Sequence, residues 1–175
     1  GNWYKIATSR TGIHRLTYDD LSSLGIPVSS IDPRNIRIYG NGGGMLPESI
    51  TAFRYDDLEE NAIFVSGEND GSFNPGDDML FYGESPNDWE FNAQNERFQH
   101  VTNAFSDYTY YFITTDLGAG KRITTQSSTV EPATDIVEKF VDYAYYEEDE
   151  LNIVGTGRTW YDSPPFDINL SQTYG

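Results

Sequence analysis

Cysteine is absent from the 175 residues, and basic residues are scarce, with 11 Lys and Arg against 28 Asp and Glu. Without cysteine the chain can form no disulfide, no cysteine-ligated zinc site and no thiol nucleophile. Its formal net charge of −17 leaves no basic surface to neutralise phosphates, which argues against nucleic acid as a partner. The missing cysteine does not by itself fix the compartment.

Long hydrophobic runs are missing too, because no stretch approaches the ~20 apolar residues that a membrane helix needs. What the chain does have is aromatic residues, with 13 Tyr, 10 Phe and 3 Trp. These can build a core, so the composition argues against disorder. The length suits one domain, or one domain with part of another. The start at Gly1, without Met, indicates a piece of a longer protein.

Short apolar segments separated by turn residues predict an all-β fold, mainly antiparallel and sandwich-like, with one or two short helices. Residues 1–130 are expected to form an N-terminal β domain. Residues 131–175 are expected to form a linker strand and the start of a second β unit, cut short. The expected strands are residues 3–8, 13–16, 36–39, 62–66, 79–82, 108–115, 136–146, 151–154 and 166–170, with residues 121–125 pairing to 108–115.

The clearest local signal predicts a two-turn helix over residues 18–24. Thr17 is a preferred N-cap residue, and Asp20 stands three positions later, as in a capping box. Gly25 and Pro27 then mark the end of the helix.

An oxygen-rich turn at residues 68–78 is the only candidate metal site, with Asp70, Asn74 and Asp77 as possible calcium ligands. The spacing is not that of an EF-hand, and a solvated acidic turn is the competing interpretation. No other cofactor is expected. The glycine-rich loop at residues 40–44 lacks the Gly-Lys-Ser/Thr ending of a phosphate loop, which favours a simple turn.

No catalytic residue is predicted within this chain. A His100, Ser106 and Asp107 assembly has only its residue types in its favour, and a structural histidine is the better interpretation. Tyr143, Tyr145, Tyr146 and Trp160 could form a sugar-binding platform, although aromatic residues in strands more often belong to a core.

Seven motifs follow one another along nearly the whole chain in an order that resembles a known family. They are Thr11-Gly12-Ile13-His14-Arg15-Leu16-Thr17-Tyr18-Asp19-Asp20-Leu21, Ile31-Asp32-Pro33-Arg34-Asn35-Ile36-Arg37-Ile38-Tyr39-Gly40, Gly43-Gly44-Met45-Leu46-Pro47-Glu48, Glu60-Asn61-Ala62-Ile63-Phe64-Val65, Gly76-Asp77-Asp78-Met79-Leu80-Phe81-Tyr82-Gly83, Asn103-Ala104-Phe105-Ser106-Asp107 before Tyr110-Tyr111-Phe112, and Tyr146-Glu147 with Asn152 and Gly157-Arg158-Thr159-Trp160. The order resembles the N-terminal region of the PorU family, the sortases of the type IX secretion system, which are related to the gingipain cysteine peptidases of the C25 family.

The resemblance implies a non-catalytic accessory module of a secreted sortase on the cell surface of Bacteroidetes-type bacteria. Such sortases cleave C-terminal signals from secreted cargo with a His–Cys pair. Because this chain has no cysteine, the catalytic domain is expected outside it. The implied partners are the rest of the same polypeptide and other outer-membrane components of type IX secretion. The implied location is exported, at the outer-membrane surface or extracellular.

A free-standing carbohydrate-binding or adhesin-like β module is the alternative function. A solvent-exposed stack of Trp and Tyr on one sheet face would favour this alternative. An extended contact surface with buried aromatic residues would favour the sortase accessory role.

Overall fold

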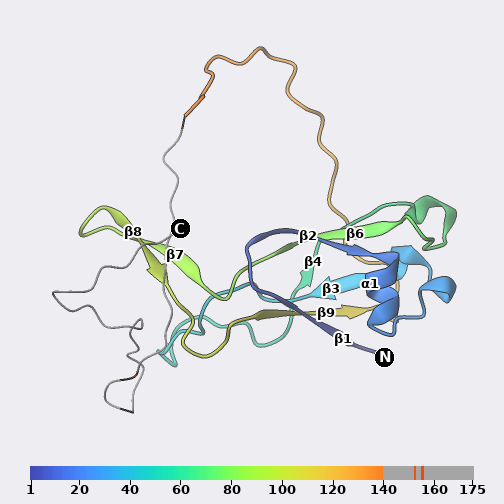
Figure 1. The fold of residues 1–175 in the computed structure, drawn as a ribbon, viewed down its shortest axis with the longest axis horizontal. Coiled ribbons are helices and arrows are strands. Elements are labelled where there is room, and N and C mark those ends of the chain that lie inside the picture. The colour runs from blue at the N-terminus through green and yellow to red at the C-terminus, as the bar shows by residue number, and fades with distance from the viewer. Residues whose placement is uncertain (140–151, 153–154, 156–175) are drawn as a thin grey trace, which may run out of the picture. The chain divides into compact units, whose positions relative to one another are not determined.

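The computed structural model describes residues 1–139, 152 and 155. The chain divides into two compact units, Gly1–Ser127 and Ser128–Gly175, and all helices and strands described below lie in the first (Figure 1). Residues 136–139 are not in a strand, so this part of the predicted 136–146 strand is wrong. The rest of that strand, the strand predicted at 166–170 and nearly all of the one at 151–154 lie outside the described residues, as does the Tyr143, Tyr145, Tyr146 and Trp160 platform.

Short strands dominate the first unit. They are β1 (Tyr4–Thr8), β2 (Gly12–Thr17), β3 (Arg37–Tyr39), β4 (Glu60–Asn61), β5 (Phe64–Val65), β6 (Asp78–Gly83), β7 (Asp88–Asn92), β8 (Arg97–Val101) and β9 (Thr109–Thr114). The helical elements are α1 (Tyr18–Ser23) and the 3₁₀ turns η1 (Val28–Ser30), η2 (Pro33–Asn35) and η3 (Glu68–Asp70). The predicted all-β class with short helices is therefore confirmed.

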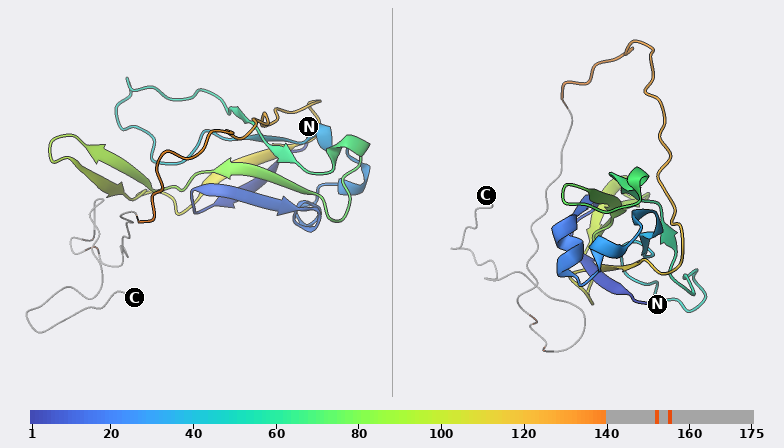
Figure 2. Two further views of the ribbon diagram at one scale, coloured as in Figure 1. Left: turned by 90° about the horizontal axis from the view of Figure 1, so that it is seen from above. Right: turned by 90° about the vertical axis from the view of Figure 1, so that its right-hand side faces the viewer.

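The strands form three antiparallel sheets. Sheet A has the order β1-β9-β3-β4, sheet B has the order β2-β6-β5, and β7 pairs with β8 as a separate hairpin. Because β1 and β2 are consecutive, the tight connection between them passes the chain from sheet A to sheet B (Figure 2).

The hydrophobic core lies between sheets A and B, because inward residues of both sheets form one buried cluster. Ile38 and Ile113 are register partners in sheet A, and Met79 and Phe81 point inward from sheet B. Tyr111 of β9 meets Phe81 edge to face, with ring centroids 5.4 Å apart. Alternation along each strand places these residues inside and their neighbours outside, so the outer face of sheet A is free to carry other side chains.

The predicted helix is confirmed together with its cap. The Thr17 hydroxyl accepts a hydrogen bond from the Asp20 amide, and the Asp20 carboxylate accepts one from the Thr17 amide at 2.8 Å. Leu21 is fully buried and joins the core. Gly25 follows the helix with a positive φ of 89°, the conformation that favours glycine.

Two features differ from the sequence-based expectation. Residues 121–125 do not pair with β9, because β1 and β3 occupy both of its edges. Arg122 instead forms an isolated parallel bridge with Ile63.

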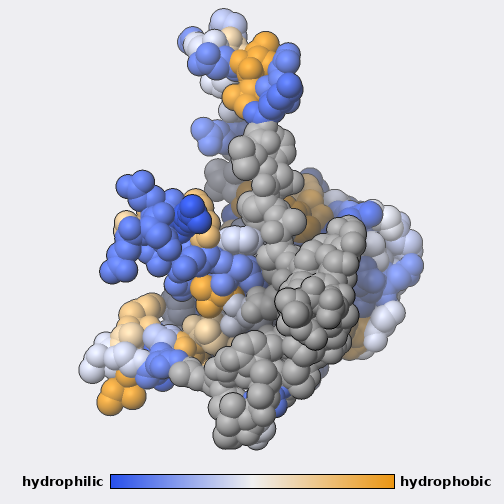
Figure 3. Space-filling model, turned by 60° about the vertical axis from the view of Figure 1, so that its left-hand side comes forward, coloured by the Kyte–Doolittle hydropathy of each residue, from blue (hydrophilic) through white to orange (hydrophobic). Residues whose placement is uncertain are grey.

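The β7–β8 hairpin was not predicted. It exposes Phe91 and Phe98, whose ring centroids lie 5.3 Å apart. Figure 3 shows hydrophobic residues lying among hydrophilic ones on the side of the molecule that carries this hairpin.

Among the helices that the structure describes, none combines the length and the apolar character required to cross a lipid bilayer.

Candidate functional site

The outer face of sheet A carries a cavity of about 450 Å³ with mostly apolar walls. Three aromatic rings line it, from Trp3 just before β1, Tyr39 of β3 and Phe112 of β9. Tyr39 and Phe112 are direct register partners, so the sheet itself sets their spacing. Trp3 meets Tyr39 edge to face, with ring centroids 5.2 Å apart. The lining is completed by Leu58, Leu117 and Asp57.

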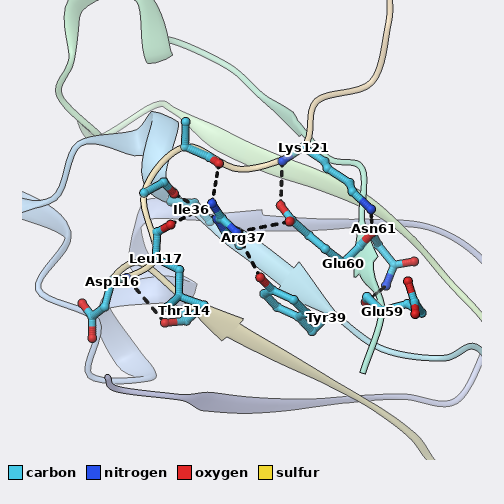
Figure 4. A network of polar contacts seen from close by, with 12 residues as sticks. Ile36, Arg37, Tyr39, Glu59, Glu60, Asn61, Thr114, Asp116, Leu117 and Lys121 are labelled. Atoms are coloured by element: carbon cyan, nitrogen blue, oxygen red, sulfur yellow. Dashed lines mark hydrogen bonds and ion pairs between the residues drawn. The ribbon is translucent and has the colours of Figure 1, made fainter. Parts of the chain in front are cut away.

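Arg37 fixes two of these walls (Figure 4). Its Nη1 donates to the Tyr39 hydroxyl at 3.2 Å and to the Glu60 carboxylate at 3.3 Å. Its Nη2 donates to the Leu117 carbonyl at 2.7 Å, and its Nε to the Gly118 carbonyl at 3.0 Å. The hydrogen bond with Tyr39 raises the pKa of the Arg37 guanidinium above its ordinary value. Arg37 is thus a positioning residue whose donors are already used, so it offers little to a ligand.

Lys121 completes the same network beside Glu60. The Lys121 amide donates to one Glu60 carboxylate oxygen at 2.7 Å, while Arg37 binds the other. The Lys121 ammonium donates to the Glu60 backbone carbonyl at 3.0 Å. Glu60 is therefore satisfied from two sides, and its charge is neutralised within the fold.

Asp57 is the carboxylate that faces the cavity without such compensation. Its Oδ1 accepts a hydrogen bond from the Leu58 amide at 2.7 Å, directly beside it in the chain. Among the described residues, ion pairs join Arg15 to Asp78, Arg34 to Asp32, Arg37 to Glu60 and Arg122 to Glu68, whereas Asp57 belongs to no ion pair. The cavity therefore combines aromatic walls with one uncompensated negative charge.

The glycine-rich loop at residues 40–44 already binds a carboxylate of the protein, that of Glu84. The Gly43 amide donates to the Glu84 carboxylate at 2.7 Å, so the loop donor that would cradle a phosphate is occupied. Gly40 is required for packing, because a Cβ there would overlap the buried ring of Tyr111. Cavities of about 170 and 340 Å³ flank the loop, and both are lined by Tyr82 and Glu84. The negative charge of Glu84 makes them poor anion sites.

The calcium candidates Asp70, Asn74 and Asp77 lie in the turn around η3. The two carboxylates cap turns there, and the Asn74 side-chain amide donates to the Asp70 carboxylate at 3.4 Å. Asp70 accepts from the Ser72 amide at 2.8 Å, and Asp77 accepts from the Asn74 amide at 2.7 Å. Within the ranges that the structure describes, no three acidic or histidine side chains are grouped as a metal site would need. Calcium binding stays a prediction, which calorimetric titration of the chain and of an Asp70→Asn/Asp77→Asn variant tests.

The residues considered for a serine-type site have local structural roles. The Ser106 hydroxyl donates to the Tyr108 carbonyl at 2.8 Å and accepts from the Tyr108 amide. His100 of β8 packs edge to face with Trp89 at 5.2 Å. A nucleophile needs its hydroxyl aimed at a base, whereas that of Ser106 is committed to its own turn.

Sequence reasoning missed the aromatic cavity, although a signal for it exists. Trp3 stands two residues before Lys5 of β1, and Tyr110 stands two residues before Phe112 on the partner strand β9. If these alternating positions are assigned to the outward side of the strands, their residues predict an aromatic outer face of sheet A. The contribution of Asp57 could not be foreseen, because it comes from an irregular segment.

Comparison with solved structures relates the chain to a known protein. No protein family profile matches the chain, and no curated protein sequence matches it. A solved structure does match: dimeric latent PorU from Porphyromonas gingivalis, with 27% sequence identity over 77% of this chain and a TM-score of 0.53. The chain is similar to a part of PorU. It spans only about 11% of the length of that PorU chain, so the similarity concerns a PorU-related region, as the order of motifs predicted.

Proposed function

We propose that this chain is a non-catalytic N-terminal accessory module of a type IX secretion sortase-like cysteine peptidase, which processes the C-terminal signals of secreted cargo. The observation that carries the proposal is the shared fold and sequence with a small part of PorU over most of this chain. The absence of any cysteine among the 175 residues supports it, since a thiol nucleophile would have to be supplied elsewhere.

The proposal assigns a location and partners to the module. The full-length protein is exported and acts at the outer-membrane surface or outside the cell. The module contacts the remainder of its own polypeptide, including a gingipain-like C25 peptidase domain, and other type IX secretion components of the outer membrane. PorU itself has been solved as a latent dimer, and an accessory module that restrains or positions a peptidase suits a protein with a latent form.

A carbohydrate-binding or adhesin-like module is the second candidate, and one observation favours it. Trp3, Tyr110 and part of Tyr39 are accessible on one sheet face, with Trp3 48% exposed. However, Trp3 meets Tyr39 edge to face, and the Lys5 ammonium covers the Tyr110 ring at 3.5 Å from its centroid. Sugar rings stack on open, flat aromatic faces, so this arrangement supports carbohydrate binding less well than it supports insertion of a side chain.

The first experiment measures peptide hydrolysis by the purified chain. The substrates are synthetic peptides that span the junction between a cargo and its C-terminal signal. We expect no turnover, because the sequence holds no thiol and Ser106 is bound within its turn. Turnover that disappears in Ser106→Ala or His100→Ala would contradict the non-catalytic assignment.

The second experiment separates the two candidate functions in the cell. The codons for residues 1–127 are deleted in frame from the natural open reading frame, and both cargo processing and cell adhesion to polysaccharide are measured. The accessory module predicts accumulation of unprocessed cargo with unchanged adhesion. Loss of adhesion with normal cargo processing would instead support the carbohydrate-binding module.

A further inference from the structure

The cavity on the outer face of sheet A has the composition of a cation-binding site. Trp3, Tyr39 and Phe112 present aromatic rings, whose faces attract cations, and Asp57 adds a carboxylate at the same cavity. Leu58 and Leu117 supply apolar surface, against which a methylene stem can pack while its charged head stays at the opening. A group that uses all three features has an aliphatic stem and a positively charged end.

Among residues 1–139, the basic side chains near the cavity are already engaged elsewhere. Arg37 donates to the Leu117, Gly118 and Ala119 carbonyls, and Lys121 is bound to Glu60. Lys5 lies over the ring of Tyr110. Among the described residues, Asp57 has no ion-pair partner, and neither has its neighbour Asp56.

The charge of the whole chain points the same way. With 28 acidic and 11 basic residues, the surface attracts a basic segment before any contact forms. An uncharged apolar side chain would pack against the aromatic rings of the cavity but would leave the Asp57 carboxylate without a counter-ion. A sugar would lose the electrostatic contribution altogether.

We propose that the Trp3–Tyr39–Phe112 cavity binds an arginine side chain of a partner polypeptide, with Asp57 as the counter-ion. A planar guanidinium can lie against an aromatic ring while it donates two hydrogen bonds to one carboxylate, which an ammonium cannot do. Arginine therefore binds better than lysine. The inference deepens the proposed function, on which it rests for the identity of the partner, because it names the chemistry that an accessory module would recognise.

The rigidity of the cavity supports specific recognition. Arg37 donates to the Tyr39 hydroxyl at 3.2 Å and to the Leu117 backbone carbonyl at 2.7 Å, so the Tyr39 ring and the backbone at Leu117 are held before a ligand arrives (Figure 4). A preformed site avoids the entropic cost of ordering its own side chains when the ligand binds.

The test uses the 175-residue chain and three matched peptides, Ac-Gly-Gly-X-Gly-Gly-NH₂, in which X is arginine, lysine or citrulline. Binding is followed by amide chemical-shift titration and by Trp3 fluorescence in a Trp89→Phe/Trp160→Phe background. We expect the arginine peptide to shift resonances of residues around the cavity. The neutral citrulline peptide should bind about tenfold more weakly or worse, and lysine should fall between the two.

Two variants one residue apart provide the control. Asp57→Asn keeps the size of the side chain, and it should weaken arginine binding about fivefold or more, whereas Asp56→Asn should stay within about twofold. Trp3→Ala should remove binding, and Trp3→Phe should retain part of it. Circular dichroism confirms that each variant is folded, and the exposed Asp57 can be changed even if Trp3→Ala misfolds.

Several outcomes would overturn the inference. Equal affinity for arginine and citrulline peptides would reduce the cavity to an apolar contact. Equal loss in Asp56→Asn and Asp57→Asn would indicate a diffuse charge effect, and shifts at the cavity with an oligosaccharide alone would favour the carbohydrate-binding module. The inference would also be overturned if no chemical shift changed at up to about 10 mM arginine peptide, which corresponds to a binding free energy weaker than about −3 kcal/mol. None of these results affects the cargo-processing experiment, so failure of this inference and failure of the proposed function are distinguishable.

Discussion

Tyr111 shows how a single side chain joins the two sheets. It belongs to β9 of sheet A, is 2% exposed, and its hydroxyl accepts a hydrogen bond from the Glu84 amide at 3.0 Å, directly after β6 of sheet B. Burial raises the pKa of the Tyr111 phenol, so the hydroxyl stays neutral across the physiological range. The same residue packs on Gly40, which links the core to the glycine-rich loop.

Tyr111→Phe should lower the free energy of unfolding by about 1–2 kcal/mol, because the partly buried Glu84 amide would lose its acceptor. Urea denaturation followed by circular dichroism measures the change. Tyr110→Phe is the matched control, since Tyr110 points outward and is 40% exposed. Its effect should stay within about 0.5 kcal/mol. Similar losses in both variants would show that the Tyr111 hydroxyl contributes nothing specific.

At the scale of elements, α1 depends on its N-terminal cap. A helix of six residues has too few internal hydrogen bonds to be stable alone, so its ends and its buried Leu21 must hold it. Thr17→Ala removes the side-chain acceptor and should cost about 1 kcal/mol. Thr17→Ser keeps the oxygen and should restore most of the loss. An unchanged denaturation midpoint for Thr17→Ala would mean that the cap is not needed.

Strand β6 is tied to its neighbours by Asp78, whose charge makes the link sensitive to pH. Hydrogen bonds from Arg15 of β2, and then from Ser66, lower the pKa of the Asp78 carboxyl below its ordinary value. The unfolded state therefore binds this proton more readily than the folded state does. The stabilisation is fully present above the unfolded pKa of about 3.9 and is lost as the pH falls through the folded value.

The difference in unfolding free energy between the native chain and Asp78→Asn isolates this contribution. We expect the difference to be constant between about pH 5 and pH 7 and to shrink progressively below about pH 4. Urea denaturation at half-unit pH intervals measures it, and Asp88→Asn serves as an exposed comparison. A difference that stays constant down to the lowest pH would exclude the ion pair as its source.

How far the sequence predicts this molecule depends on how local each feature is. The capped helix and most strands follow from neighbouring residues, so Thr17 with Asp20 could be identified directly. The pairing of 121–125 was wrong because β9 gains two partners distant in sequence, β1 and β3. The β7–β8 hairpin was missed because its two strands contain few apolar residues, so the apolar–polar alternation that indicates a strand is weak. The period-two spacing of aromatic residues in 108–115 indicates an aromatic strand face, but the register that sets Tyr39 opposite Phe112 and the irregular segment that brings Asp57 leave no local pattern.

At the scale of the whole molecule, the acidic surplus should make stability depend on salt. Eleven basic residues can neutralise only some of the 28 acidic ones. The remaining carboxylates repel one another, and this repulsion is stronger in the compact folded state than in the unfolded chain. Salt also weakens the ion pairs, but exposed pairs are worth only about 0–1 kcal/mol each, and at least one partner in Arg15–Asp78 and Arg34–Asp32 is more than half exposed. Relief of repulsion should therefore exceed the loss of pairs.

We expect the melting temperature at pH 7 to rise by a few degrees as NaCl increases from about 20 to 300 mM, and to level off once the screening length falls below about 6 Å. Calorimetry at several salt concentrations measures the rise. A variant with three exposed carboxylates removed, Asp56→Asn/Asp88→Asn/Glu90→Gln, should start higher and gain less from salt. A melting temperature that falls with salt would instead mean that the ion pairs, Arg37–Glu60 and Arg122–Glu68 foremost, outweigh the repulsion of the unpaired acids.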